Sequence, residues 1–182
     1  MKNAFEVRGE VTVIFLKYKD CTIEALISTK RLEKLKEYRG TFHAKRCQST
    51  NKFYVRGDVR ESGKKKSILL HRFITNALPG EEVDHINHNP LNNTDDNLRK
   101  VSGAQNSQNR DGPNKNGTSG YRGVSWHKRI GKWQCSFMLN GKHHHVGYFE
   151  ELEQAIEAIK KARAINMPFS TEAIETREKD DR

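Results

Sequence analysis

The sequence predicts an α+β protein with a β-rich N-terminal region, a central ββα unit and a C-terminal three-stranded antiparallel sheet packed on one helix. Short runs of alternating apolar and polar residues predict the strands, and one apolar stripe at helical spacing predicts the long helix. A change to His- and Asn-rich composition after residue 70 marks the central unit. The predicted parts are 1–67, 68–110, a linker at 111–119, 120–168 and a charged tail at 169–182.

The N-terminal region consists mainly of predicted strands. Alternation in residues 11–16 and 23–27, on either side of a Lys-Asp turn, predicts a hairpin. Residues 29–38 are polar and predict a short helix at most. Further strands are expected at 41–46, 52–59 and 67–70. Because no residue pattern here indicates chemistry, we interpret the region as a β-rich platform.

The central unit contains two predicted short strands, at 82–86 and 98–101, joined by a loop rich in Asn and Asp. Ser102 is a good N-cap for a short helix that carries Asn106. Such a unit can bring Asp84, His85 and Asn106 together. Neighbouring strand residues point to opposite faces. Asp84 and His85 therefore share a site only if the strand end twists or bulges, or if metal and water lie at its edge.

These three residue types suit phosphodiester hydrolysis. Mg²⁺ (or Mn²⁺) takes one or two oxygen ligands from protein and the rest from water and phosphate, and Asp84 and Asn106 offer such oxygens. His85, with an ordinary pKa near 6.5, can accept a proton from an attacking water at neutral pH. Three scattered cysteines without a C-x-x-C pair do not indicate a structural zinc site.

The C-terminal part has a distinct charge pattern. Residues 112–149 contain no Asp or Glu and six Lys or Arg, which indicates a nucleic-acid-binding surface. Strands are expected at 121–124, 133–139 and 143–149, with a tight Asn-Gly turn before the last. A helix at 151–166 should cover the face formed by Trp133, Cys135, Phe137 and Leu139. The tail after Pro168 is expected to be frayed.

Overall composition agrees with a polyanionic partner but does not establish one. Lys and Arg number 33 against 23 Asp and Glu, which gives a formal charge of +10. Neutralising phosphates releases condensed counterions, so such a balance favours nucleic acid, although a basic metabolic enzyme would show it too. No apolar run long enough for a membrane span and no signal-peptide pattern are present. We therefore expect a cytoplasmic, intracellular protein.

Four blocks of the central unit resemble the HNH endonucleases of phage and intron homing type over about residues 68–110. They are Leu70-His71-Arg72-Phe73-Ile74, Val83-Asp84-His85, Asp96-Asn97-Leu98-Arg99 and Gln105-Asn106-x-x-Asn109. The resemblance implies a ββα-metal fold in which His85 is the general base, Asp84 and Asn106 hold one divalent metal, and Asn97 braces the hairpin loop. It also implies 5′-phosphate and 3′-hydroxyl products, and a phage-infected bacterial cell as one setting.

Residues 119–166 resemble the plant APETALA2/ethylene-response-factor DNA-binding domain. The matching segments are Tyr121-Arg122-Gly123-Val124, Gly131-Lys132-Trp133 and Gly147-Tyr148-Phe149, followed by the helix. The resemblance implies a sheet lying in the major groove of double-stranded DNA. Since four sheet positions differ from the family, its target sequence is not transferable. The expected DNA-contacting residues are Arg122, Lys128, Arg129, Lys132, Gln134, Ser136, Lys142, His143 and His145; a solvated basic face is the alternative.

Together these patterns predict a site-specific DNA endonuclease with one divalent metal and a His general base. One alternative is a non-catalytic, sequence-specific DNA-binding regulator that uses the same fold without cutting. Another is a nuclease that acts on RNA or on any DNA. The sequence indicates neither the target site nor the oligomeric state.

Overall fold

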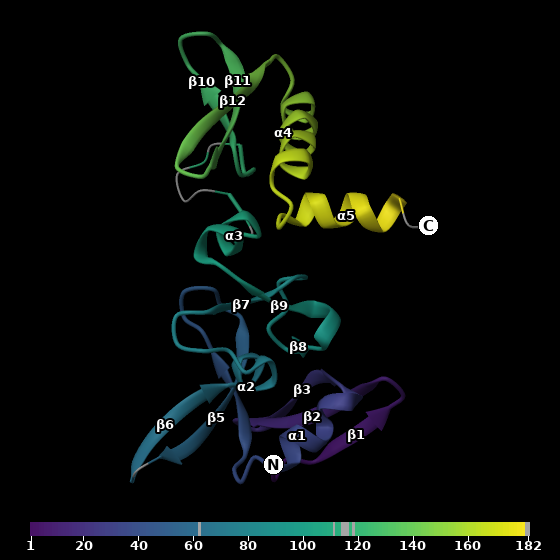
Figure 1. The fold of residues 1–182 in the computed structure, drawn as a ribbon. Helices are drawn as coiled ribbons and strands as arrows, with labels where there is room; N and C mark the ends of the chain where they lie inside the picture. The colour runs from purple at the N-terminus through teal and green to yellow at the C-terminus, as the bar shows by residue number, and fades with distance from the viewer. Residues whose placement is uncertain (62, 111, 114–116, 118, 181–182) are drawn as a thin grey trace. The chain divides into compact units, whose positions relative to one another are not determined.

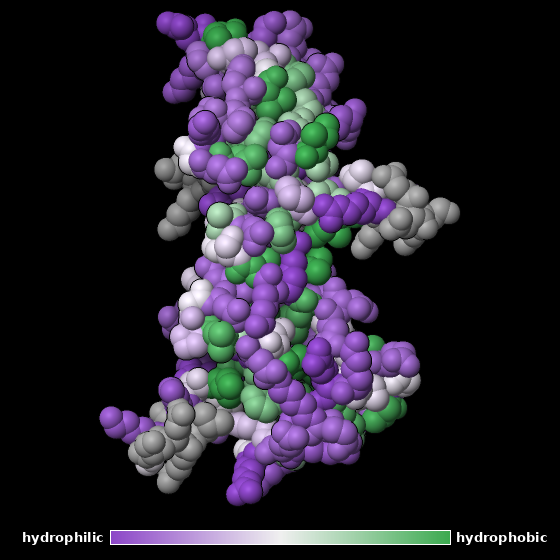
Figure 2. Space-filling model, viewed as in Figure 1, coloured by the Kyte–Doolittle hydropathy of each residue, from purple (hydrophilic) through white to green (hydrophobic). Residues whose placement is uncertain are grey.

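A computed structural model describes residues 1–182 except 62, 111, 114–116, 118 and 181–182. The chain divides into two compact units, residues 1–102 and residues 103–182. Figure 1 shows small sheets and short helices in both, which confirms the predicted α+β class. On the face drawn in Figure 2, hydrophilic side chains predominate. None of the described helices is long and apolar enough to cross a bilayer.

The first unit begins with an antiparallel meander. Strands β1 (Phe5–Arg8), β2 (Val11–Tyr18) and β3 (Cys21–Ser28) pair in sequence order, and β8 (Asn92–Asn93) adds to β3 in parallel. The predicted β2–β3 hairpin is thus confirmed, and β1 and β8 add one further strand on each side of it. Strand β1 was not predicted, because it is only four residues long and all four are exposed.

A second sheet follows a helical turn made of η1 (Thr29–Arg31) and α1 (Leu32–Lys36). Its strands β4 (Phe42–Arg46), β5 (Phe53–Glu61) and β6 (Lys64–Leu69) are antiparallel and adjacent in that order. One side of this sheet joins the core of the unit. That core includes Ile14, Leu16, Ala25, Ile27, Leu35, Phe42, Val55, Leu70 and Ile74.

The predicted ββα strands are present within one residue of the expected limits. Strands β7 (Glu82–His85) and β9 (Leu98–Val101) pair antiparallel, and η2 (Asp95–Asn97) precedes β9. Strand β8 lies within the loop between them and pairs with β3, where Asn93 lies opposite Ile27. The loop of the ββα unit is therefore attached to the first sheet.

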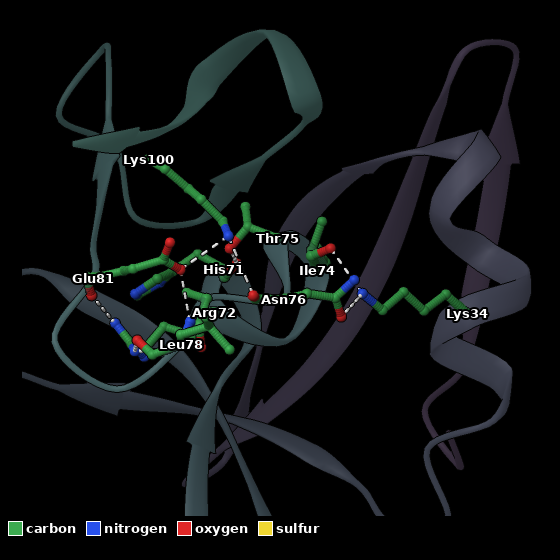
Figure 3. Close-up of polar contacts among 10 residues, drawn as sticks. Lys34, His71, Arg72, Ile74, Thr75, Asn76, Leu78, Glu81 and Lys100 are labelled. Atoms are coloured by element: carbon green, nitrogen blue, oxygen red, sulfur yellow. Dashed lines mark hydrogen bonds and ion pairs between the residues drawn. The ribbon is translucent and has the colours of Figure 1, made fainter.

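Helix α2 (Leu70–Thr75) is short, but polar contacts hold its C-terminal end (Figure 3). Asn76 adopts the left-handed conformation that ends many helices. Lys34 Nζ donates to the Asn76 side-chain oxygen at 2.6 Å and to a carbonyl of the last helical turn at 2.9 Å. The guanidinium of Arg72 donates to the Glu81 carbonyl at 2.6 Å. These bonds fix the helix that carries His71.

The second unit contains the predicted sheet and covering helix. It comprises α3 (Gly103–Gln108), β10 (Val124–His127), β11 (Lys132–Leu139), β12 (Lys142–Phe149), α4 (Leu152–Asn166) and α5 (Thr171–Asp180). The three strands are antiparallel in sequence order. Val124, Cys135, Ala155 and Ile159 are buried between the sheet and α4, with Trp133 and Phe137 packed against them.

Two local predictions for this unit were wrong, and the linker is described only in part. The first strand is β10, not residues 121–124, because Gly120 and Gly123 have positive φ angles and form a turn before it. The tail is not frayed at residues 171–180, where it forms α5. Ala173 is buried and Glu172 pairs with Arg163 at 2.8 Å, contacts that a charged composition conceals. Residues 111, 114–116 and 118 of the expected linker lie outside the described residues.

Candidate active site

His85 lies at the end of β7 and is only 7% exposed. Its Nε2 is 3.3 Å from Oδ1 of Asn93, a fully buried residue. The Asn93 amide nitrogen donates to the Pro90 carbonyl at 3.2 Å, so the Asn93 oxygen is the atom that faces the ring. An oxygen can only accept here, and Nε2 must therefore carry the hydrogen. In the neutral ring this leaves the basic lone pair on Nδ1.

Two aromatic side chains pack edge-on against the His85 ring. The His71 ring is 4.9 Å from it between centroids at 84°, and the Tyr54 ring is 6.4 Å away at 74°. Burial lowers the pKa of His85 below its ordinary value, although the Asn93 hydrogen bond and the Asp84 charge oppose this. The ring is thus neutral at neutral pH, as a proton acceptor must be.

Asp84 precedes His85 and forms an ion pair across the hairpin. It lies opposite Arg99 in the β7–β9 register, and the Arg99 Nε and Nη2 atoms are 2.9 Å and 2.7 Å from Asp84 Oδ2. Both side chains are largely buried. The strand therefore ends with a fixed carboxylate and a fixed imidazole on consecutive residues.

The predicted metal ligands, Asp84 and Asn106, offer the oxygen atoms that a hard, hydrated divalent ion prefers. The described part of the chain contains no cluster of three or more His, Cys, Asp or Glu residues of the kind that encloses zinc. Mg²⁺ and Mn²⁺ need only one or two protein oxygens, and the Asp84 carboxylate is the predicted one in the first unit. Asn106 lies on α3 in the second unit, and its role as a metal ligand stays a prediction.

Asn97 connects the two ends of the loop between β7 and β9. Its Oδ1 accepts from the Asn87 amide at 2.9 Å, and its Nδ2 donates to the Asn92 carbonyl at 2.7 Å. Its own carbonyl accepts from the Ile86 amide at 2.9 Å. A loop held in this way keeps His85 and Asn93 at a constant separation.

Sequence reasoning missed several residues of this site. Asn93 is one of many asparagines in the loop, and nothing in the local pattern distinguishes it. His71 was interpreted as structural, and it is buried as that interpretation requires. Tyr54 lies on β5, far from the motif in sequence. Arg99 stood within a recognised block, but only the strand register pairs it with Asp84.

Replacing Asn93 with alanine is expected to lower the DNA cleavage rate about a hundredfold while DNA affinity measured in EDTA stays unchanged. Without the acceptor, the His85 ring can rotate, and small misplacements of a catalytic group cost about this much. Single-turnover cleavage and anisotropy titrations would measure the two quantities. Asn87→Ala, an exposed position in the same loop, is the matched control. A variant that melts earlier but cuts at the wild-type rate would show that Asn93 acts on stability alone.

Replacing His71 with phenylalanine is expected to reduce the acid sensitivity of folding. Burial, together with the nearby His85 and Arg72, lowers the pKa of His71 to about 3. In the unfolded chain this imidazole takes up a proton near pH 6.5. The stabilisation that the neutral, buried ring gives the folded protein is therefore complete above pH 6.5 and is lost as pH falls toward 3. Between these two pH values the free energy of unfolding should change by up to ~1.4 kcal/mol per pH unit.

Urea unfolding followed by circular dichroism at pH 7.5 and pH 5 would test this expectation. The wild type should lose ~2 kcal/mol more than His71→Phe over that interval, from the one proton involved. His85, whose pKa is also lowered, leaves the variant with some acid dependence. Equal losses in the two proteins would mean that His71 titrates normally in the folded state.

Three of the nine expected DNA-contacting residues lie together on one side of the sheet of the second unit. Gln134 and Ser136 alternate with the buried face of β11, and His145 lies opposite Ser136. The exposed Tyr148 ring packs on the His145 ring at 4.7 Å, so this side carries more aromatic surface than the sequence suggested. His144 faces the other way and stacks on Phe137.

The remaining positions differ in their surroundings. Lys128 and Arg129 are exposed in the turn between β10 and β11, and Lys142 and His143 are exposed at the start of β12. Lys132 pairs with a glutamate, Glu150, at 3.1 Å. Whether these residues touch DNA stays a prediction.

Arg122 has a structural role that the sequence did not indicate. Its guanidinium donates to the carbonyls of Ser107, Gln108 and Arg110 at 2.8, 3.1 and 2.9 Å, and so holds the end of α3. Burial is the main reason that its pKa falls to about 10. A DNA contact by Arg122 stays a prediction, and it would require these bonds to be exchanged for phosphate or base contacts.

Comparison with known proteins gives one family match and two viral relatives. An HNH endonuclease family profile matches residues 75–108. Protein 3.8 of Escherichia phage T7 is 35% identical over 91 residues, which are 50% of this chain and 74% of that protein. The uncharacterized HNH endonuclease L560 of Acanthamoeba polyphaga mimivirus is 36% identical over 96 residues, 48% of this chain and 47% of the relative. This chain thus spans about half of the mimivirus protein. No solved structure matches significantly.

Proposed function

The chain belongs to the same protein family as protein 3.8 of phage T7 and contains an HNH endonuclease domain, and from this premise we propose that it is a metal-dependent, site-specific endonuclease of double-stranded DNA. One observation carries the proposal. A buried, neutral His85 is fixed by Asn93 directly after a carboxylate, Asp84, that is fixed by Arg99. This arrangement provides a base and an oxygen donor at one strand end.

In the proposed reaction His85 is the general base. Its Nδ1 accepts a proton from a water molecule whose oxygen attacks phosphorus. A new P–O bond forms as the bond to the 3′ oxygen breaks, which leaves a 5′-phosphate and, after protonation, a 3′-hydroxyl. Asp84 and Asn106 would hold the divalent ion, and the chemistry it supplies when bound is neutralisation of charge on the phosphate and the leaving oxygen. Asn97 and Asn93 keep the base in place.

The second unit is the proposed DNA reader. Its support is the acid-free segment 112–149, the exposed polar side of the sheet and the resemblance to the APETALA2/ethylene-response-factor domain. Phosphate contacts would give most of the affinity, and the sheet side would select the bases. A homing-type role follows from the family resemblance and belongs to the same proposal.

The decisive test is cleavage of supercoiled plasmid and phage genomic DNA with Mg²⁺ or Mn²⁺, with EDTA as the control. We expect discrete, metal-dependent fragments, and nicked against linear plasmid will report whether one or both strands are cut. DNA that is bound but never cut would replace this proposal with the DNA-binding regulator. Equal degradation of RNA, or fragments without discrete sizes, would replace it with a general nuclease.

A further inference from the structure

The β4–β5–β6 sheet has a polar side whose role the motif analysis does not assign. Strand alternation places Phe42, Ala44 and Val55 on the core side, and the residues between them on the other. On this second side His43 lies opposite Arg56, Lys45 opposite Tyr54, and Asp58 opposite Ser67. We call these six residues the polar sheet side.

The polar sheet side is hollowed into a groove. A cavity of about 350 Å³ is lined by His43, Lys45, Arg56, Asp58 and Ser67. Lys45 is exposed and Arg56 half-buried. Among the described residues, neither cation forms an ion pair with an acidic side chain. The groove therefore offers two cations, Lys45 and Arg56, at neighbouring positions. Asp58 and Ser67 lie opposite each other at its other end.

Tyr54 connects the polar sheet side to the candidate active site. Tyr54, opposite Lys45 and two residues before Arg56, directs its ring at His85 and His71, with centroids 6.4 Å and 6.3 Å away. Successive same-side residues of a strand are about 7 Å apart. Lys45 therefore lies beside Tyr54 on the neighbouring strand, and Arg56 lies one same-side position farther along β5. Both cations belong to the same unit of the chain as His85.

We propose that the polar sheet side binds the sugar-phosphate backbone of the DNA strand that His85 cuts, through Lys45 and Arg56. This assigns a substrate-binding role to the N-terminal region, and its relation to cleavage rests on the proposed nuclease function. A guanidinium suits phosphate oxygens by its fork of donors, and a lysine ammonium supplies a second point charge.

The test compares DNA binding by wild type and the double variant K45A/R56A. The full chain is titrated with a duplex in EDTA, where no cleavage occurs, between 50 and 200 mM salt. Each lost phosphate contact should reduce the slope of log affinity against log salt by about 0.9, so the double variant should lose about two. Over this range the wild type should lose about tenfold more affinity than the variant.

Two matched variants complete the design. K45R/R56K retains both charges and should keep the wild-type slope. K17A/K19N removes two charges from the β2–β3 hairpin and should also keep it; asparagine tolerates the positive φ of Lys19. Unfolding midpoints confirm that each protein is folded.

The results separate this inference from the proposed function. If wild type cuts DNA and K45A/R56A keeps the wild-type slope, the polar sheet side is not a phosphate track and the nuclease stands. If no protein cuts DNA but the K45A/R56A slope falls, the surface binds DNA and the nuclease proposal fails. An equal decrease of the salt slope in K17A/K19N would mean that the slope follows overall charge rather than contacts in the groove, and it would overturn the inference.

Discussion

His85→Ala is expected to lower the rate of metal-dependent DNA cleavage by about 10²- to 10⁴-fold, the range that general bases supply. The ring is the proposed proton acceptor at the end of β7, and within the described part of the chain no other imidazole is bonded to Asn93. His71 does not substitute for His85, because burial lowers the pKa of His71 to about 3. The His71 ring packs edge-on against the His85 ring. Alanine removes the base and leaves the Asp84–Arg99 pair in place.

The measurement is single-turnover cleavage of plasmid, together with duplex affinity in EDTA. Affinity should be unchanged, since His85 is only 7% exposed and offers little surface to DNA. His88→Asn is the matched control: it removes an imidazole from the adjoining loop, and asparagine tolerates the positive φ at that position. Equal cutting by His85→Ala and wild type would remove His85 from the mechanism and favour the regulator.

Gly123→Ala is expected to destabilise the second unit by ~3 kcal/mol or more. Gly123 has a φ of +85°, which costs an L-residue about 1 kcal/mol. An added Cβ would also lie 2.7 Å from the Ser136 carbonyl oxygen and 3.0 Å from Ile159 Cγ1. The close atom is backbone in the central strand, so relief requires a shift of the sheet or of α4, and overpacking of this kind costs ~1–3 kcal/mol.

Tryptophan fluorescence makes this prediction specific. The chain contains two tryptophans, Trp126 and Trp133, and both lie in the second unit, where their rings pack at 5.1 Å. Their emission during urea titration therefore follows that unit. Gly131→Ala is the matched control, because Gly131 has a φ of +67° but no atom within 4 Å of an added Cβ. Equal losses in both variants would mean that the backbone angle, not the contact with Ser136, accounts for the effect.

Local patterns predicted the elements whose stability is local. Strands β7 and β9 and helix α4 were expected within one or two residues, because period-two and period-3.6 patterns are properties of a single segment. β10 was misplaced because the turn at Gly123 depends on the close approach of Ser136, which lies on another strand. α5 was missed because its buried side, Ala173, is a small part of a highly charged segment.

The candidate site divides in the same way. The motif blocks named Asp84 and His85, since these residues are adjacent and chemically distinctive. They could not name Tyr54, because its approach to His85 depends on how the second sheet packs beside the ββα hairpin. They could not pair Arg99 with Asp84 either, since the loop between the strands is too long to fix the register by its turn type. Long-range packing decided both.

The ion pair between Arg99 and Asp84 has a consequence for how the protein is made. In a zinc finger the free energy of metal binding drives folding, and the polypeptide stays unfolded without the metal. Here the carboxylate assigned to the metal already has a cationic partner within the hairpin, at 2.7 Å. Asp84 therefore has its charge offset by Arg99 before any metal binds. On the proposed function the ion would supply reactivity rather than architecture, and the polypeptide would fold in an inert form before the metal is loaded.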